Sequence, residues 1–130
     1  MPFDLTYDFS SQCVFARFTG RITMTLVREY ITALLPLLEK HDCRRVLSDS
    51  RAATLELSAL DILQFPKMAE ALPLAARCKR AVLAAPGNSG YDMYQILSEM
   101  QGHKVRLFAN CADAMEWLMR EEPEEAEEAE

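Results

Sequence analysis

The segment that most constrains the fold is residues 80–85, which are almost wholly apolar after the initial arginine and lie between two helical patterns. A strand of this kind has both faces covered, as is typical of a strand inside a parallel sheet. The surrounding order is strand, helix, strand, helix, strand, helix, which predicts right-handed crossovers and parallel pairing of the three strands. We expect strands at 45–49, 80–85 and 104–108, and helices at 58–71, 91–101 and 111–120.

The amino-terminal part of the chain shows a different pattern. Residues 3–9 alternate apolar and polar side chains, and residues 13–18 are rich in β-branched and aromatic side chains, which together predict an antiparallel hairpin. Gly20 is expected to end the second strand, and Thr23 to cap a helix that ends near His41. The predicted fold is therefore α/β, with a mixed five-stranded sheet that begins with this hairpin, continues as parallel βαβαβα and has helices packed on it.

The predicted helices begin at residues that are typical N-caps, and two of them contain an internal proline. Ser58 and Asp61 have the spacing of a capping box, in which hydroxyl and carboxylate satisfy amide hydrogens of the first turn. Asn110 is placed to cap the last helix. Pro36 and Pro66 fall inside the first two helices, where each removes an amide donor and is expected to kink or break the helix.

The charge is concentrated at the carboxyl end of the sequence. Residues 121–130 hold seven of the 20 acidic side chains and no basic one, so the rest of the chain has 14 basic and 13 acidic side chains. We expect a single domain at 1–120 and an acidic, disordered tail at 121–130 that solvates the protein or, alternatively, binds a partner. The nearly neutral body offers no footprint for nucleic acid or anionic headgroups, so we expect no nucleic-acid partner.

The sequence shows no targeting signal for export. The spacing of its cysteines does not indicate a metal site. No stretch approaches the roughly 20 apolar residues that span a bilayer, and the first residues lack a basic and then apolar leader, so we expect a cytoplasmic protein. The four cysteines form no Cys-x-x-Cys pair, and we expect free thiols that pack as small hydrophobes, with no metal or cofactor. They are Cys13, Cys43, Cys78 and Cys111.

Polar segments follow each of the three parallel strands. In open α/β sheets ligands bind beyond the carboxyl ends of the strands, so we expect these segments, with Asn110, to form one rim. One hypothesis is a small enzyme in which Asp49 is the base and Arg51 holds an anionic substrate; the other is that the two residues form a structural pair. His41 and His103 precede strands and should lie at the opposite end. The candidate ligand residues of the rim are Asp49, Ser50, Arg51, Asn88, Ser89 and Gly90.

The second and third predicted helices have more apolar residues than one core-facing stripe requires. The stripe of the third helix is predicted to be Met93, Ile96, Leu97 and Met100. A groove between the two helices would suit an apolar or anionic ligand, a partner helix or a second copy of the chain in a homodimer, whereas the alternative is ordinary core packing. The candidate groove residues are Phe65, Met68, Tyr91 and Tyr94.

The order of elements, the strand 46–49 that ends in aspartate, and the segment 105–108 followed by Ala114 and Trp117-Leu118 resemble the STAS-like superfamily. More narrowly, the chain looks like stand-alone bacterial proteins of the SpoIIAA-like branch, and the similarity covers residues 3 to about 120. It implies a central sheet with helices on one side and a non-enzymatic regulatory or ligand-binding module. Related lipid-carrying folds make an apolar ligand conceivable by analogy of fold.

Anti-sigma-factor antagonists of that superfamily present a phosphorylatable serine in an Asp-Ser-Ser-Gly-like motif. The matching segment 56–59 is Glu-Leu-Ser-Ala, which keeps the serine as Ser58 and lacks both the aspartate and the glycine. We therefore expect Ser58 to act as a helix cap, with phosphorylation as the alternative and Ser50 as a weaker site. The sequence predicts a STAS-like module that acts through protein contact or a ligand between its second and third helices.

Overall fold

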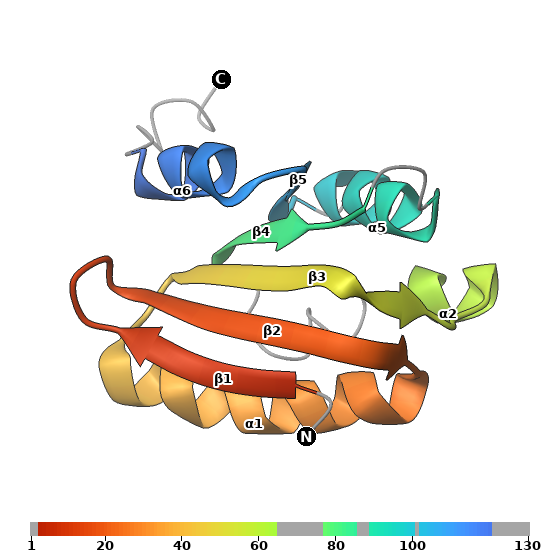
Figure 1. The fold of residues 1–130 in the computed structure, drawn as a ribbon, viewed down its shortest axis with the longest axis horizontal. Helices are drawn as coiled ribbons and strands as arrows, with labels where there is room; N and C mark the ends of the chain where they lie inside the picture. Colours follow the sequence, from red (N-terminus) through yellow and green to blue (C-terminus); the bar gives the residue numbers. More distant parts are fainter. Residues whose placement is uncertain (1–2, 65–76, 86–88, 101, 121–130) are drawn as a thin grey trace.

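The computed structural model describes residues 3–64, 77–85, 89–100 and 102–120 (Figure 1). The described elements alternate between strands and helices after an initial pair of strands. They are β1 (Phe3–Asp8), β2 (Cys13–Ile22), α1 (Met24–His41), β3 (Arg45–Leu55), α2 (Ala59–Leu63), β4 (Lys79–Leu83), α5 (Ser89–Met100), β5 (Lys104–Phe108) and α6 (Cys111–Met119).

The five strands form one sheet in the order β1-β2-β3-β4-β5. β1 is antiparallel to β2, and the pairs β2–β3, β3–β4 and β4–β5 are parallel. The predicted α/β class and mixed five-stranded sheet are therefore confirmed. The second strand of the hairpin also belongs to the parallel set, because α1 carries the chain from β2 back to the start of β3.

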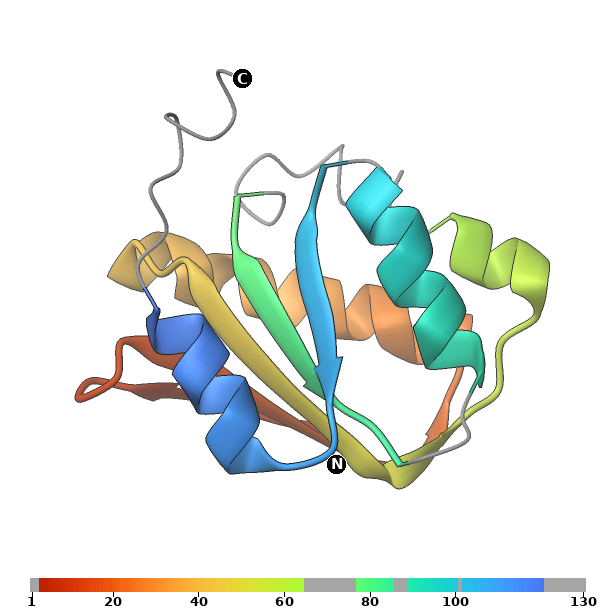
Figure 2. The same cartoon turned by 90° about the horizontal axis from the view of Figure 1, so that it is seen from above.

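Helices cover both faces of the sheet. α1 packs on one face over residues such as Val14 and Val46, and α5 packs on the same face over Val82 and Val105. Their common face follows from topology, because successive right-handed crossovers that move in one direction place their helices on one side. α6 covers the opposite face, as Figure 2 shows, so the one-sided arrangement implied by the resemblance does not extend to this helix.

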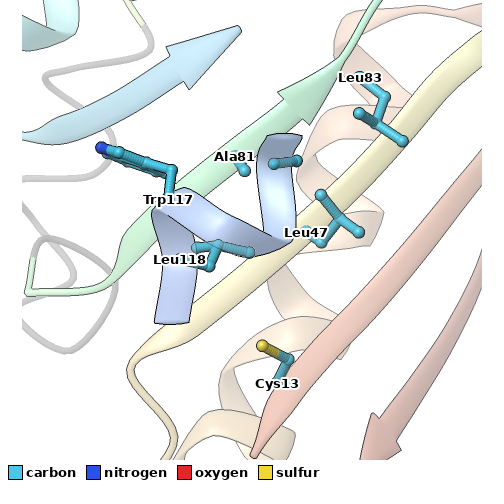
Figure 3. Close-up of a cluster of buried hydrophobic side chains, with 7 residues drawn as sticks. Cys13, Leu47, Ala81, Leu83, Trp117 and Leu118 are labelled. Atoms are coloured by element: carbon cyan, nitrogen blue, oxygen red, sulfur yellow. The ribbon is translucent and has the colours of Figure 1, made fainter. Parts of the chain in front are cut away.

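The cluster beneath α6 contains the most fully buried side chains of that face. Leu118 and Ala81 are completely buried (Figure 3). The ring of Trp117 packs against Phe108 with centroids 5.7 Å apart. These apolar contacts fix α6 across β3 and β4. The carboxyl end of α6 consequently lies over the amino ends of those strands, where Lys79 and Arg45 contact its last carbonyl groups.

β2 and β3 are longer than the sequence pattern indicates. The prediction that Gly20 ends β2 is wrong, because the strand continues to Ile22 with Gly20 at a φ of 78° and paired with Ala53. The prediction that β3 stops at Asp49 is also wrong, since it continues to Leu55. The two extensions support each other, because residues 19–22 of β2 pair with residues 52–55 of β3.

The helix caps occur where the sequence places them. Thr23, Ser58 and Asn110 each accept a hydrogen bond from a backbone amide of the first turn. The break expected at Pro36 is absent: α1 is continuous from Met24 to His41, and Pro36 lies on its exposed side. The predicted second helix is described only as far as Leu63, and the remainder, with Pro66, lies outside the described residues.

The cysteines divide into a buried set and one exposed residue. Cys13, Cys43 and Cys78 are buried free thiols within the core, as predicted. Cys111 is exposed, which corrects the expectation that it packs as a small hydrophobe. It is the first residue of α6, whose buried positions begin at Ala114.

Candidate anion-binding site

Asp49 and Asn110 lie together at the carboxyl end of the sheet, as the predicted rim requires. Asp49 pairs with Leu83, and Leu83 pairs with Phe108, so Asp49 is level with the last residues of β4 and β5. Asn110 follows Phe108 by two positions and caps α6. Ser89 and Gly90 are the first residues of α5, whereas Gly87 and Asn88 lie outside the described residues.

Asp49 and Arg51 form a bidentate pair within β3, which is a strand at this point and not the predicted loop. Arg51 Nε donates to Asp49 Oδ1 at 3.0 Å and Arg51 Nη2 donates to Asp49 Oδ2 at 2.9 Å. The hydrogen bond from the Arg51 side chain is the main reason why the pKa of Asp49 is lowered. A carboxylate held in this way is a weaker base, so the geometry favours the structural pair over the enzyme hypothesis.

The other polar groups of the rim are also satisfied locally. Asn110 accepts from the Asp113 amide at 2.9 Å and donates to the Asp113 carboxylate at 3.1 Å. Ser50 is buried, and Ser58 is engaged in its capping box with Asp61. The Asp49 and Asn110 side chains of the rim are therefore engaged in local contacts with Arg51 and Asp113.

α5 has its hydroxyl groups on the inside. Tyr91 and Ser98 are buried, and Tyr94 is half-buried and accepts a hydrogen bond from Arg80 Nη1 at 3.0 Å. A second nitrogen of the guanidinium group of Arg80, Nη2, lies 3.2 Å from His103 Nδ1. Because arginine can only donate, Nδ1 of His103 is the acceptor in this contact.

The predicted apolar stripe of this helix is consequently wrong. Met93, Ile96 and Met100 are exposed, by 36%, 57% and 77%, because the opposite face is the one that packs on β4 and β5. α2 contacts α5, and its Leu60 and Leu63 are exposed as well. The candidate groove residues Phe65 and Met68 lie outside the described residues.

A hollow of about 700 Å³ opens at the amino end of the sheet, opposite the predicted rim. Its wall contains six arginine or lysine side chains and a histidine, against one acidic side chain, Asp42. We call it the cationic hollow. Its lining residues are Tyr7, Gln12, His41, Asp42, Cys43, Arg44, Arg45, Arg77, Lys79, Lys104, Leu118 and Arg120.

Three of the cations that line the cationic hollow are located on neighbouring strands of the sheet. Arg45, Lys79 and Lys104 are in register on β3, β4 and β5, so three like charges lie side by side on one face. Adjacent like charges on neighbouring strands are destabilising unless a negative group lies close by. Any compensation must come from groups on the elements that surround this row.

The carboxyl end of α6 supplies that compensation. Arg45 Nε donates to the carbonyl oxygen of Leu118 at 3.2 Å, and Lys79 Nζ donates to that of Trp117 at 2.6 Å and that of Arg120 at 3.1 Å. The last carbonyl groups of a helix carry about half a negative charge, which suits cations. This partial charge is smaller than the full charges of Arg45 and Lys79 that it meets.

Three further cations of the cationic hollow point into solvent. Arg44, Arg77 and Arg120 are exposed, and none forms an ion pair with any residue of the part that the structure describes. The two ion pairs of that part, Arg21–Glu56 and Arg51–Asp49, lie elsewhere. Guanidinium groups in this state bind carboxylate or phosphate oxygens through two parallel hydrogen bonds.

Sequence reasoning missed the cationic hollow because it summed the charge of the whole body. The available signal is positional: basic residues stand at or just before the first residue of β3, β4 and β5, and Arg120 ends α6. Parallel strands bring such positions to one end of the sheet. His41, whose ring stacks on Tyr7 with centroids 3.8 Å apart, lies at this end, as predicted for the histidines.

The described residues contain no cluster of three or more histidine, cysteine or acidic side chains that could hold a metal ion. No helix in the described ranges has the length and apolar character needed to cross a membrane. No protein-family model matches the sequence, and no curated protein is significantly similar to it. The resemblance to STAS-like proteins therefore stays a prediction.

Proposed function

We propose that this protein is a non-enzymatic binding module of the STAS-like regulatory kind, and that its cationic hollow binds a segment of an acidic protein partner. The observation that supports this function is an open hollow with six cationic side chains, of which Arg44, Arg77 and Arg120 have no ion-pair partner among the described residues. Exposed guanidinium groups that line one hollow are suited to several carboxylates at once.

The shape of the charge distribution favours an acidic peptide over a nucleic acid. Proteins that bind nucleic acids spread basic residues along a groove that follows many phosphates. Here the cations line one hollow, and the body as a whole has 14 basic and 13 acidic side chains. A short run of glutamate or aspartate matches this local concentration of positive charge.

Titration with a heptaglutamate peptide tests the proposed function. In the double variant Arg44→Gln with Arg77→Gln, we expect the affinity at low salt to fall about tenfold or more, because two charge-assisted contacts are lost. The matched control is Arg17→Gln with Arg28→Gln, which removes two exposed arginines that do not line the cationic hollow. Equal losses in both double variants would show that the peptide responds only to net charge and would refute the site.

Self-association through α5 is a second candidate function, favoured by the inverted arrangement of that helix. Met93, Ile96 and Met100 follow each other at intervals of three and four residues and form an exposed apolar stripe. A stripe of this kind can pack against a second copy in a symmetric dimer. Light scattering should show a dimer that Ile96→Glu dissociates and that Met119→Glu, on α6, does not.

A further inference from the structure

We propose that the acidic segment bound by the cationic hollow carries an aromatic side chain next to its acidic run, and that this side chain packs on Phe9. This inference rests on the proposed function, since it concerns the same partner. It adds a feature of the partner that the cations of the cationic hollow do not specify.

Three rings form a continuous cluster at the edge of the cationic hollow. Tyr7 and His41, which both line the hollow, are stacked with their centroids 3.8 Å apart. The ring of Phe9 stands perpendicular to these two rings, with centroid distances of 4.9 Å and 5.5 Å. We call the three side chains the aromatic platform. Phe9 is 76% exposed, so most of its ring is accessible to a partner at a point that adjoins the hollow.

The exposed ring of Phe9 is presented by a turn that local hydrogen bonds hold in place. The carboxylate of Asp8 accepts hydrogen bonds from the amide and the hydroxyl group of Ser11, at 3.0 Å and 2.6 Å. The carbonyl oxygen of Ser11 accepts a further hydrogen bond from Arg45 Nη1, on β3, at 3.4 Å. Because the turn is ordered before binding, a partner that covers Phe9 loses little affinity to the ordering of this surface.

The charges beside the aromatic platform favour an uncharged side chain of the partner at this position. Asp8 directly precedes Phe9, and Asp42 directly follows His41. The hydrogen bond from the Ser11 side chain is the main reason why the pKa of Asp8 is lowered, so this carboxylate is ionised at neutral pH. Two aspartates repel a glutamate at the aromatic platform. The acidic run of the partner is therefore directed away from Phe9 and toward the arginines of the cationic hollow.

An aromatic side chain suits the exposed ring of Phe9 better than an aliphatic one. Aromatic pairs in offset or perpendicular arrangements gain more than the burial of their area provides, and aromatic anchors contribute strongly at protein interfaces. The contact is apolar, so dissolved salt does not screen it, whereas salt weakens the contacts of the acidic run. The two parts of the partner should consequently respond differently to ionic strength.

The test uses two peptides of equal charge: seven glutamates flanked on both sides by tryptophan, and seven glutamates flanked on both sides by serine. In calorimetric titrations, the wild type should bind the tryptophan peptide about tenfold more tightly than the serine peptide. This ratio should persist as salt is added, although both affinities fall. Phe9→Ser should bring the ratio close to one and leave the affinity for the serine peptide unchanged.

Two control variants separate the ring of Phe9 from general effects on the protein. Leu60→Ser, at a residue of α2 that is 72% exposed and does not line the cationic hollow, should keep the wild-type ratio. Phe9→Tyr, which retains the ring, should keep it as well. An unchanged ratio in Phe9→Ser, or equal affinities of the two peptides for the wild type, would overturn the inference. The proposed function would stand in either case if the serine peptide still bound through Arg44 and Arg77, and it fails if the wild type does not bind the serine peptide.

Discussion

Lys79 Nζ donates a 2.6 Å hydrogen bond to the carbonyl oxygen of Trp117 and lies 4.7 Å from the centroid of the indole ring of the same residue. One cation of β4 therefore satisfies a carbonyl group at the carboxyl end of α6 and packs on the main aromatic side chain of that helix. This double contact joins the cationic hollow to the hydrophobic core.

Replacement of Lys79 by methionine, which keeps the aliphatic stem, should lower the free energy of unfolding by about 1–2 kcal/mol. The loss reflects carbonyl groups of α6 without a donor and a weaker contact with Trp117. Urea denaturation followed by the fluorescence of the single tryptophan measures it. Arg44→Met, on an exposed cation of the same hollow, should change stability by less than about 0.5 kcal/mol. Equal losses in the two variants would contradict the assigned role of Lys79.

The Asp49–Arg51 pair should make stability depend on pH in the acidic range. The pKa of Asp49 is lowered from 3.8, so its stabilising contribution is complete above that value and is lost as the pH falls through the lower pKa of the folded state. The side chains of Arg51 and Asp49 are 45% and 27% exposed, so the coupling energy at pH 7 should be below about 1 kcal/mol.

A double-mutant cycle with Asp49→Asn and Arg51→Gln measures this coupling. The interaction energy should be favourable at pH 7 and at pH 5 and should shrink toward zero as the pH falls through the lowered pKa of Asp49, because the carboxylate is then neutralised. A coupling that persists unchanged at the lowest pH would show that the two side chains interact by some means other than charge.

Ser58 should contribute as a helix cap. Its Oγ accepts from the Asp61 amide at 3.2 Å, and the Asp61 carboxylate accepts from the Ser58 amide at 3.1 Å. Ser58→Ala should destabilise the protein by about 1 kcal/mol, whereas Ser58→Gly should cost only a few tenths. Thermal unfolding of the two variants beside Thr25→Ala, on an exposed helix residue without a capping role, provides the comparison. No difference between Ser58→Ala and the wild type would exclude the capping role.

Ser98 should be a position where removal of a hydroxyl group increases stability. The residue is completely buried in α5, and its Oγ makes no hydrogen bond with the rest of the described chain. Ser98→Ala removes this unsatisfied group and improves helix propensity, so the free energy of unfolding should rise by about 1 kcal/mol. Guanidinium denaturation of the single variant is sufficient, and a loss of stability would mean that the hydroxyl group has a bound partner.

The thiols should differ strongly in reactivity. Burial raises the pKa of Cys78 to about 11 and also raises the pKa of Cys13, so both remain protonated and inaccessible at pH 8. Cys111 is exposed at the start of α6. Brief treatment of the folded protein with iodoacetamide, followed by peptide mass spectrometry, should modify Cys111 alone. Modification of Cys78 at a similar rate would show that the core opens locally.

Features that depend on a few neighbouring residues could be predicted from the sequence. The caps at Thr23, Ser58 and Asn110 depend on one side chain and the amides of the next turn. The apolar character of β4 is enough to place it inside a parallel sheet, because a side chain on either face meets a helix. Neither inference needs knowledge of distant parts of the chain.

Features that depend on distant elements could not be predicted in this way. The orientation of α5 involves a polar partner on β4, because Arg80 donates a hydrogen bond to Tyr94 on the face that packs against the sheet. The apolar pattern of residues 91–101 contains no information about this partner. The cationic hollow unites Arg44, Arg77 and Arg120, which lie far apart in sequence and meet only through the strand order. The net charge of the chain does not show that these three arginines lie at one end of the sheet.

The strand order β1-β2-β3-β4-β5 also bears on how the protein is made. Strands that are neighbours in the sheet are consecutive along the chain, so no strand has to be inserted between two that have already paired. The sheet can grow outward from the hairpin in the order in which a ribosome releases the polypeptide. β5 is the last strand to be added, and its Lys104 and Arg106 discourage an unrelated chain from extending the ladder during synthesis.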